Sequence, residues 1–370
     1  MNKKCVKIIA SAAITPAGSD INSSLESFFD GKPSFSLPDH FDSKGLSLGI
    51  CRDIDTASAK GNSRAERLLN ALLPQLSRHD AWSSEIPLYL ATTVGSVDLL
   101  ENSSGGIYPD ATGNLLECAG KIFNLKNTLL VSAACASGQK ALVMAAESII
   151  RGQNRYALVV GCDICSEFVT SGFFSLGALS HGVTSPYDAD RDGLTLGEAA
   201  GAVLLAADDC PEAAEGYIRG WGETCDAAHI TAPDVSGVGL VAAIADALTM
   251  AGVLPEDIAG IMGHGTGTVY NDQAEIAALN TFFNGSSRAL YSLKGNIGHT
   301  LGATGVLQNI FGVRFAQRGI FPPQAGLKTP MKGAEKMVSA AVSGIVGNKI
   351  LSLNIGFGGL NSAIILEVAS

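Results

Sequence analysis

Cys135 is the residue of this sequence best placed to do covalent chemistry, because it stands between an expected strand and an expected helix. It lies in Ser-Ala-Ala-Cys-Ala-Ser-Gly at residues 132–138. Residues 128–131 predict a buried strand, and residues 139–150, apolar on nearly every face, predict a core helix. Unpaired N–H groups and the helix dipole favour a thiolate at a helix start. We therefore expect a lowered pKa and a nucleophilic Cys135, although a small buried side chain would explain this segment alone equally well.

Two histidines in the second half of the chain favour the catalytic interpretation. His264 lies in Gly-His-Gly-Thr-Gly-Thr (263–268), after an apolar strand, and His299 ends Lys-Gly-Asn-Ile-Gly-His (294–299), before a helix of small residues. A glycine-rich turn, Asn-Ile-Gly-Phe-Gly-Gly-Leu-Asn, follows at residues 354–361. Glycines allow backbone amides to approach a ligand closely. Two histidines in such surroundings are harder to explain as structural residues than one would be.

In combination, these motifs resemble the β-ketoacyl-(acyl-carrier-protein) synthases of the thiolase superfamily, specifically the elongating Cys-His-His type, over almost the whole chain. The resemblance implies that Cys135 accepts an acyl group from a thioester, in an oxyanion hole made by the backbone N–H groups of Cys135 and Phe357. It implies that His264 and His299 donate hydrogen bonds to the enolate oxygen formed when a malonyl thioester loses CO2. Lys294 would order the site electrostatically. The implied reaction is a decarboxylative Claisen condensation with malonyl-acyl carrier protein that gives a 3-oxoacyl-acyl carrier protein.

The same resemblance assigns residues to substrate binding. Thr266 and Thr268, with Thr231, correspond to residues that hydrogen-bond the pantetheine arm. Phe173 and Phe174 correspond to the acyl pocket, and Phe174 stands where the family commonly has glycine. The resemblance implies no cofactor and no metal, because the substrates arrive on the phosphopantetheine arm of acyl carrier protein.

Composition and element order agree with a large α/β protein. The chain has 370 residues, 46% of them hydrophobic, and 43 glycines, and expected strands and helices alternate throughout without a linker. The resemblance implies a single thiolase-fold unit over residues 1–370, with duplicated βαβαβαββ halves in a five-layered αβαβα arrangement. We expect the N-terminal half to cover residues 1–213 and to carry Cys135. The C-terminal half, residues 214–370, would carry both histidines.

The sequence departs from the family at Gln308. The family usually has an acidic residue at this place, which can offset the charge of the active-site lysine, here Lys294. A buried Lys294 without an acidic partner would favour its uncharged form. We expect another carboxylate to compensate, with Glu198, Asp272 and Glu275 as candidates. This departure, and a length shorter than that of housekeeping members, favour a specialised polyene or polyketide pathway as much as fatty acid synthesis.

The charge of the chain bears on its partners. A net charge of −10 excludes general attraction to nucleic acid, yet acyl carrier proteins are themselves acidic, so docking needs a local basic patch. Lys60, Arg64 and Arg67 are the expected patch. The eight cysteines lack secretory spacing and no stretch is long enough to span a membrane, which predicts a cytoplasmic protein. The resemblance implies a homodimer, or a heterodimer with a related ketosynthase-like subunit.

Two other functional classes stay open. A chain-length-factor-like partner of a heterodimeric ketosynthase would have the same fold without catalysis, but such partners replace the nucleophile that Cys135 supplies here. A thiolase acting on coenzyme A esters would carry a second cysteine in a Cys-x-Gly turn near the C-terminus. The corresponding turn of this chain is Gly-Phe-Gly-Gly at residues 356–359.

Overall fold

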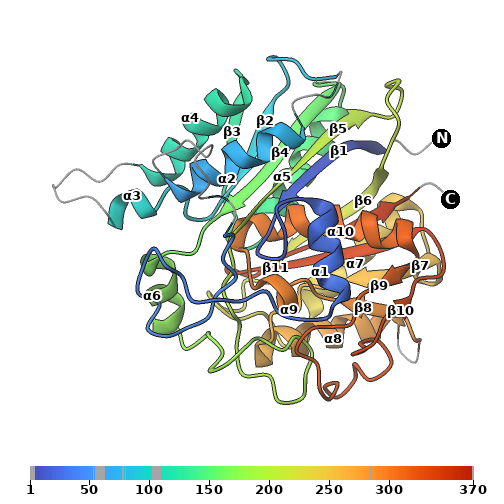
Figure 1. Cartoon of the computed structure of the whole chain (residues 1–370). Coiled ribbons are helices and arrows are strands. Elements are labelled where there is room, and N and C mark those ends of the chain that lie inside the picture. The colour runs from blue at the N-terminus through green and yellow to red at the C-terminus, as the bar shows by residue number, and fades with distance from the viewer. Residues whose placement is uncertain are drawn as a thin grey trace.

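The computed structural model describes residues 5–52, 54, 63–76, 79, 81–101, 110–283 and 286–368. Within these ranges, one ten-stranded sheet has the order β3-β2-β4-β5-β1-β6-β12-β11-β7-β8 (Figure 1). None of the helices in the described ranges has both the length and the apolar character needed to cross a bilayer.

The two halves of the chain contribute consecutive elements to this sheet. The first half contains β1 (Val6–Ile14), α1 (Ile21–Phe29), α2 (Arg64–Leu72), β2 (Leu88–Ala91), α3 (Asp98–Glu101), α4 (Ala111–Phe123), β3 (Thr128–Val131), α5 (Ser137–Ile150), β4 (Tyr156–Asp163), α6 (Glu167–Ser175) and β5 (Ala199–Ala207). The second half contains β6 (Gly216–Cys225), α7 (Val238–Ala251), β7 (Ile258–Met262), α8 (Val269–Phe283), β8 (Ala289–Tyr291), α9 (Lys294–Ile297), α10 (Thr304–Arg318), β9 (Ile320–Phe321), β10 (Ser343–Gly344), β11 (Lys349–Gly356) and β12 (Leu360–Glu367).

The sheet repeats one pattern of strand order and direction. In the first half β3, β2 and β4 are parallel, and β5 pairs antiparallel with both β4 and β1. In the second half β8, β7 and β11 are parallel, and β12 pairs antiparallel with both β11 and β6. Within the sheet, the two halves are joined where Val6, Lys7 and Ile8 of β1 pair with β6. The expected α/β fold with duplicated halves is confirmed, and residue 213 lies in the link between β5 and β6.

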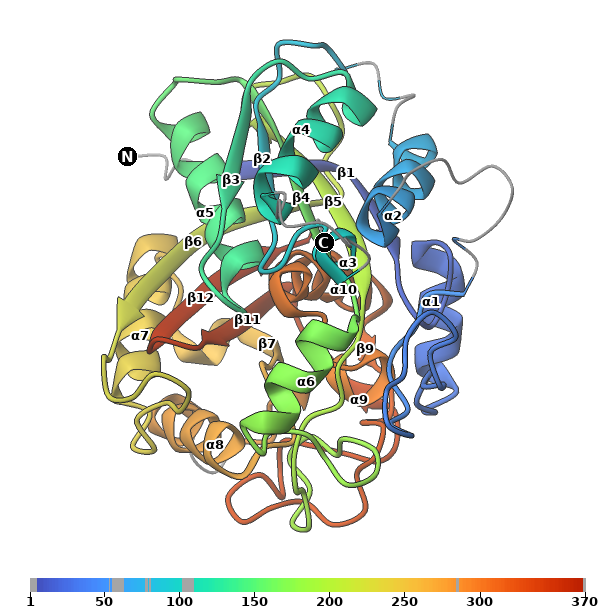
Figure 2. The ribbon, with the colours of Figure 1, turned by 90° about the vertical axis from the view of Figure 1, so that its left-hand side faces the viewer.

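Helices and sheet alternate in layers. The apolar side chains of α5 and α10 share a central core with strands of both halves, whereas α2 and α4 cover the outer face of the first half and α7 and α8 that of the second. Figures 1 and 2 show the two outer pairs on opposite sides of the molecule. Because α5 and α10 lie between the two halves of the sheet, they are buried around most of their circumference.

The two central helices approach each other more closely than side chains would allow. A Cβ atom on Gly305 would lie 2.3 Å from the backbone nitrogen of Gln139, and one on Gly138 would lie 2.7 Å from the carbonyl oxygen of Gly302. Only glycine permits such backbone contact. The contact brings the start of α5, which follows Cys135, next to the start of α10, which follows His299.

We expect Gly305→Ala to separate the two central helices. The added methyl group would meet the backbone of Gln139, which should cost about 2 kcal/mol of unfolding free energy by overpacking. Gly172→Ala in α6 is the control, because a Cβ atom there meets nothing within 4 Å. Alanine in that helix interior should be neutral or stabilising by up to about 1 kcal/mol. Denaturant unfolding of both variants measures the difference, and equal effects would contradict a backbone constraint at Gly305.

Candidate active site

Four segments from both halves converge on one cavity of about 390 Å³. Cys135, His264, His299 and Phe357 all line it. Cys135 follows the β3 strand, His264 follows β7, His299 follows α9, and Phe357 follows β11. Most of the exposed surface inside the cavity is apolar, which suits a hydrocarbon chain.

Cys135 is held by a strained turn at the start of α5. Ala134 has a φ of +48°, the left-handed region that a non-glycine residue enters at a cost of about 1 kcal/mol. The Ser137 hydroxyl secures the turn, because it donates to the Ala134 carbonyl at 2.5 Å and accepts from the Ala133 N–H at 2.8 Å. Cys135 itself is 5% exposed. The turn therefore presents the thiol to the cavity and shields it from bulk water.

The expected lowering of the Cys135 pKa is wrong. Burial raises the pKa of this thiol to about 11, and the carboxylate of Asp163 adds to the increase. The positive charge of Lys294 and hydrogen bonds from the backbone N–H groups of Phe357 and Cys135 lower the pKa without reversing the effect of burial. The resting nucleophile is consequently a thiol, which loses its proton as it attacks.

Phe357 lies in a turn that packs against the nucleophile. A Cβ atom on Gly356 would lie 3.1 Å from the Ala136 nitrogen, and Gly358 has a φ of +86°. A hydrogen bond from the Phe357 N–H lowers the pKa of the Cys135 thiol. The turn thus brings the Phe357 backbone beside the start of α5. The oxyanion hole formed by the Cys135 and Phe357 N–H groups stays a prediction of the resemblance.

The two imidazoles are neutral and have the same tautomer. Their ring centroids are 5.6 Å apart and the rings are nearly perpendicular, at 87°. Burial, with the nearby charge of Lys294, holds both pKa values well below the usual range. The Nδ1 atom of His264 is 3.3 Å from the Lys294 ammonium, and that of His299 accepts from the Leu301 N–H at 3.1 Å. Because each Nδ1 accepts a hydrogen bond, each neutral ring carries its proton on Nε2.

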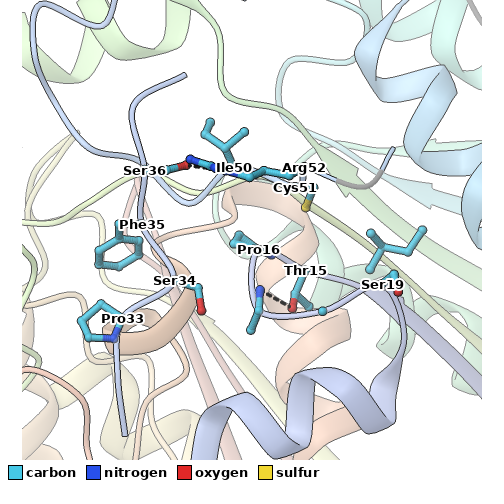
Figure 3. A pocket seen from close by; sticks show the side chains of 13 residues that line it. Thr15, Pro16, Ser19, Pro33, Ser34, Phe35, Ser36, Ile50, Cys51 and Arg52 are labelled. Carbon is cyan, nitrogen blue, oxygen red and sulfur yellow. Dashed lines mark hydrogen bonds between the residues drawn. The ribbon is translucent and has the colours of Figure 1, made fainter. Parts of the chain in front are cut away.

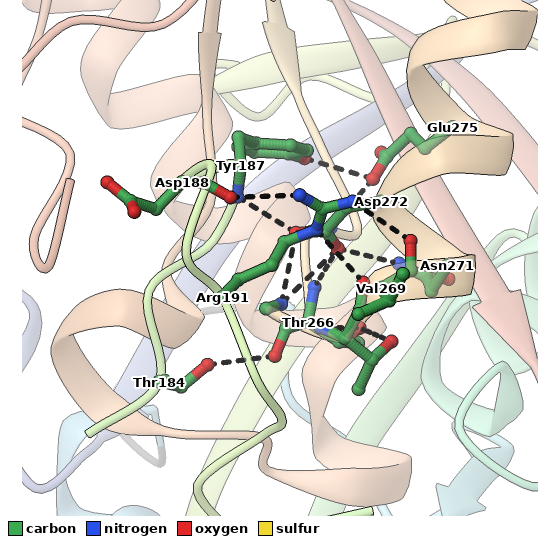
Figure 4. Close-up of polar contacts among 12 residues, drawn as sticks. Thr184, Tyr187, Asp188, Arg191, Thr266, Val269, Asn271, Asp272 and Glu275 are labelled. Carbon is green, nitrogen blue, oxygen red and sulfur yellow. Dashed lines mark hydrogen bonds and ion pairs between the residues drawn. The ribbon is translucent and has the colours of Figure 1, made fainter. Parts of the chain in front are cut away.

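Two acidic residues of α8 partly offset the effect of burial on Lys294. Burial lowers the pKa of Lys294 to about 8, while Glu275 and then Asp272 oppose that shift. Glu275 accepts from the His264 N–H at 2.6 Å, and burial raises its pKa to about 7. Asp272 accepts from the Thr266 N–H at 2.9 Å. Asp272 also pairs with the Arg191 Nε at 3.6 Å (Figure 4). Because the pKa of Lys294 stays below its ordinary value, the expected compensation by these two residues is partial.

Glu198 does not compensate Lys294, because its carboxylate is paired with Arg64. Gln308 is turned toward β11, where its Nε2 donates to the Leu353 carbonyl at 2.8 Å. Its Oε1 atom is buried without a hydrogen-bond partner. The position that the family reserves for an acid is therefore occupied by a neutral side chain with one unused acceptor.

The expected substrate residues divide into two groups. Thr231, Thr266, Thr268 and Phe173 line the cavity, and the ring of Phe173 is 5.9 Å from that of Phe357. Phe174 is 67% exposed and lies outside the cavity lining. The expectation for Phe174 is wrong because consecutive helical residues point about 100° apart, so only one of the two faces the cavity.

The expected docking patch is wrong at Arg64, which is 1% exposed and paired with Glu198. Arg67 is partly buried, and Lys60 lies outside the described residues.

Two site residues had no signal in the spacing of the sequence. Tyr187 is fully buried, donates from its hydroxyl to Glu275 at 3.0 Å, and donates from its N–H to Asp272 at 2.8 Å. Asp163 accepts from the Thr92 hydroxyl at 2.6 Å and from the Gly302 N–H at 2.7 Å. Asp163 thereby ties the turn after β2 to the turn after His299. Apart from spacing, the position of Asp163 at the end of an apolar strand is the sequence feature that could have indicated it.

The chain is similar to known proteins in sequence and in structure. The family models described as "Beta-ketoacyl synthase, N-terminal domain" and "Beta-ketoacyl synthase, C-terminal domain" match residues 123–209 and 215–328. A 3-oxoacyl-[acyl-carrier-protein] synthase 2 of Synechocystis is 28% identical, over 98% of this chain and 97% of its own length. The corresponding protein of Mycobacterium leprae is 33% identical over 52% of this chain, and the aligned part spans about half of that relative, 49%.

Among solved structures, a chain of the ketosynthase complex with its chain length factor from Xenorhabdus doucetiae is 27% identical, with a TM-score of 0.83. That alignment covers 99% of this chain and 98% of the other. The duplicated sheet and the central helices define a protein of the thiolase fold. Within that class, the chain belongs to the β-ketoacyl synthase family.

We predict that alkylation of Cys135 by iodoacetamide depends steeply on pH. A thiol with a pKa of about 11 should react about tenfold faster for each added pH unit between pH 7 and 10, since only the thiolate reacts. Peptide mass analysis separates Cys135 from the exposed Cys225, which serves as the internal control for reagent and accessibility. A plateau in the Cys135 rate below pH 8 would contradict the raised pKa.

We predict that Gln308→Glu destabilises the protein, and more so at higher pH. With Glu275 and Asp272 already opposing the shift of Lys294, a new carboxylate beside the Leu353 carbonyl would be a surplus buried charge, costing about 3 kcal/mol when ionised. Burial would raise its pKa above the unfolded value, so the stability difference should be small near pH 4 and increase toward pH 8. Thermal unfolding across this range measures the effect, with the neutral Gln308→Met variant as control. A constant difference across pH would contradict a buried charge.

Proposed function

We propose that the protein catalyses a decarboxylative Claisen condensation, in which an acyl group on Cys135 is joined to malonyl-acyl carrier protein to give 3-oxoacyl-acyl carrier protein. The observation that carries the proposal is the pair of neutral, Nε2-protonated imidazoles in the same cavity as a buried thiol and the Phe357 amide. Donors fixed in a dry cavity stabilise developing negative charge most effectively.

The first half-reaction transfers the acyl group. The Cys135 sulfur attacks the carbonyl carbon of an acyl-carrier thioester, and the Cys135 and Phe357 N–H groups stabilise the oxyanion. The bond from the carbonyl carbon to the pantetheine sulfur then breaks. The proton released from the Cys135 thiol balances the proton taken up by the departing pantetheine thiol, so the net proton change is zero.

The second half-reaction forms the carbon–carbon bond. The malonyl thioester loses CO2, and the electrons of the broken bond form an enolate whose oxygen accepts from the His264 and His299 Nε2–H groups. The enolate carbon attacks the acyl carbonyl on Cys135, and the bond from that carbonyl carbon to the Cys135 sulfur breaks. The sulfur leaves as a thiolate and takes up one proton from water to return to the thiol, so this half-reaction consumes one proton. A neutral imidazole suits this role, because it donates a hydrogen bond to the enolate oxygen without transferring a proton to the enolate carbon before that carbon attacks. Thr266 and Thr268, whose hydroxyl oxygens are 2.8 Å apart in the cavity lining, would hydrogen-bond the pantetheine arm.

The proposed partners are an acyl carrier protein and a second ketosynthase-like subunit, either a copy of this chain or a related one. The similar chain from Xenorhabdus doucetiae belongs to a complex of a ketosynthase with its chain length factor. In this chain β3 is an edge strand of the sheet, and Leu129 on it is 43% exposed. An apolar edge strand is a surface that a second sheet can extend. A cytoplasmic location accords with the eight cysteines, all of which are free thiols.

We predict that the two half-reactions are lost separately. Cys135→Ala should abolish acylation while malonyl decarboxylation persists, because the histidines remain. His299→Ala should lower decarboxylation by about 10²–10³, with acylation of Cys135 largely retained. His181→Ala is the matched control, since its side chain is 93% exposed.

Intact-protein mass spectrometry after incubation with acyl-carrier protein measures acylation, and CO2 release from malonyl-carrier protein measures decarboxylation. Wild-type protein that neither becomes acylated at Cys135 nor releases CO2 would contradict the proposed reaction. That result would instead favour a non-catalytic, chain-length-factor-like role.

A further inference from the structure

A buried ion pair connects α2 to the segment beside His299, and no step of the proposed reaction uses it. Arg64 is 1% exposed and Glu198 is fully buried. The Arg64 Nε donates to both carboxylate oxygens of Glu198, at 3.0 and 2.8 Å, and an Arg64 terminal nitrogen donates to one of them at 2.6 Å. Burying two charges is costly unless further hydrogen bonds complete the pair. Its presence in the core therefore needs an explanation beyond stability.

The ion pair is also hydrogen-bonded to backbone groups of two other segments. Glu198 accepts from the Cys51 N–H at 2.8 Å and from the Cys165 N–H at 3.3 Å, and Arg64 donates to the Cys51 carbonyl at 2.8 Å. The segment that carries Cys51 also borders a pocket of about 350 Å³, where Cys51 and Arg52 lie opposite Pro33 and Ser34 (Figure 3). The hydrogen bonds to the ion pair therefore add to the core packing of Cys51 in holding this segment.

From Glu198 the structure leads directly to His299 through the backbone. The Gly197 N–H donates to the His299 carbonyl at 3.0 Å, and the His299 N–H donates to the Thr195 carbonyl at 2.7 Å. A Cβ atom on Gly197 would lie 2.1 Å from the Ile297 carbonyl oxygen, and one on Gly49 would lie 2.2 Å from the same oxygen. Three backbone segments thus pack more closely than side chains allow. A shift of residues 195–198 must be accompanied by a shift of His299.

We propose that the Arg64–Glu198 ion pair positions His299, by anchoring residues 195–198 from the side opposite the cavity. Neither residue lines the cavity, so both act through the backbone and not on the substrate. The bidentate geometry suits this task, because a guanidinium fork fixes both the distance and the orientation of a carboxylate. The expected loss of malonyl decarboxylation rests on the proposed condensation, whereas the expected change in the orientation of His299 does not.

Glu198→Gln tests the proposal, because glutamine retains the shape but removes the charge that holds Arg64. Loss of His299 alignment should lower the kcat of malonyl decarboxylation by about tenfold to a hundredfold. KM and the rate of Cys135 acylation should remain near wild type, since neither depends on His299. Nitrogen NMR of labelled histidine provides the second measurement. His299 should show one Nε2–H tautomer in the wild type and a changed or averaged signal in the variant, with the His264 signal unchanged.

Two further variants make the test decisive. Glu215→Gln breaks the Arg314–Glu215 ion pair of 2.6 Å, which lies away from the cavity lining, and should leave decarboxylation and both histidine signals unchanged. If Glu198→Gln does not fold, Arg64→Lys retains the charge while losing the bidentate fork, and should give a smaller change in the same direction.

A folded Glu198→Gln or Arg64→Lys variant with wild-type decarboxylation and an unchanged His299 signal would overturn the proposal. Equal loss of acylation and decarboxylation would also overturn it, because that indicates general damage. If the wild-type protein carries out no condensation, the proposed function fails, and the NMR comparison still decides whether the pair positions His299.

Discussion

Exclusion of water is the constraint on which the properties of this site depend. Cys135, His264, His299, Lys294 and Glu275 are all buried in one small region, and desolvation is the largest influence on the pKa of each. Desolvation keeps the thiol protonated, keeps the imidazoles neutral and makes the lysine less basic. A site built in this way has little net charge at rest. Negative charge appears only when a thioester reacts, and the hydrogen-bond donors are already oriented toward it.

The local order of elements was predictable from the sequence because it follows from short-range rules. The apolar strands before Cys135 and His264 and the glycine turn around Phe357 each have a pattern that indicates the end of a strand. Asp272 and Glu275 were recognised only as two of three candidate acids, together with Glu198, because the sequence alone does not show which acid lies beside Lys294. The resemblance added the global arrangement that these local patterns leave open. The confirmed α/β fold rests on both.

Other features depend on tertiary contacts that no local pattern encodes. Arg64 begins an amphipathic helix and resembles a surface residue, yet it reaches a carboxylate 134 positions away in the chain. The pKa of Cys135 was predicted from the helix start alone, whereas the structure adds a desolvation that outweighs it. Phe174 differs from Phe173 only by one step of helical rotation. Such a difference is decided by how α6 is placed, which the sequence of the helix does not specify.

The central helices have a consequence for how such a fold diverges after gene duplication. Their contact is made by Gly138, Gly302 and Gly305, not by the nucleophile or the histidines. A copy of this chain could therefore lose Cys135 by a single substitution and keep its layers, its cavity and its edge strand. Selection would then act on the shape of such a copy alone. The architecture thus allows a pseudo-symmetric pair to arise in which one member performs the chemistry and the other only completes the assembly.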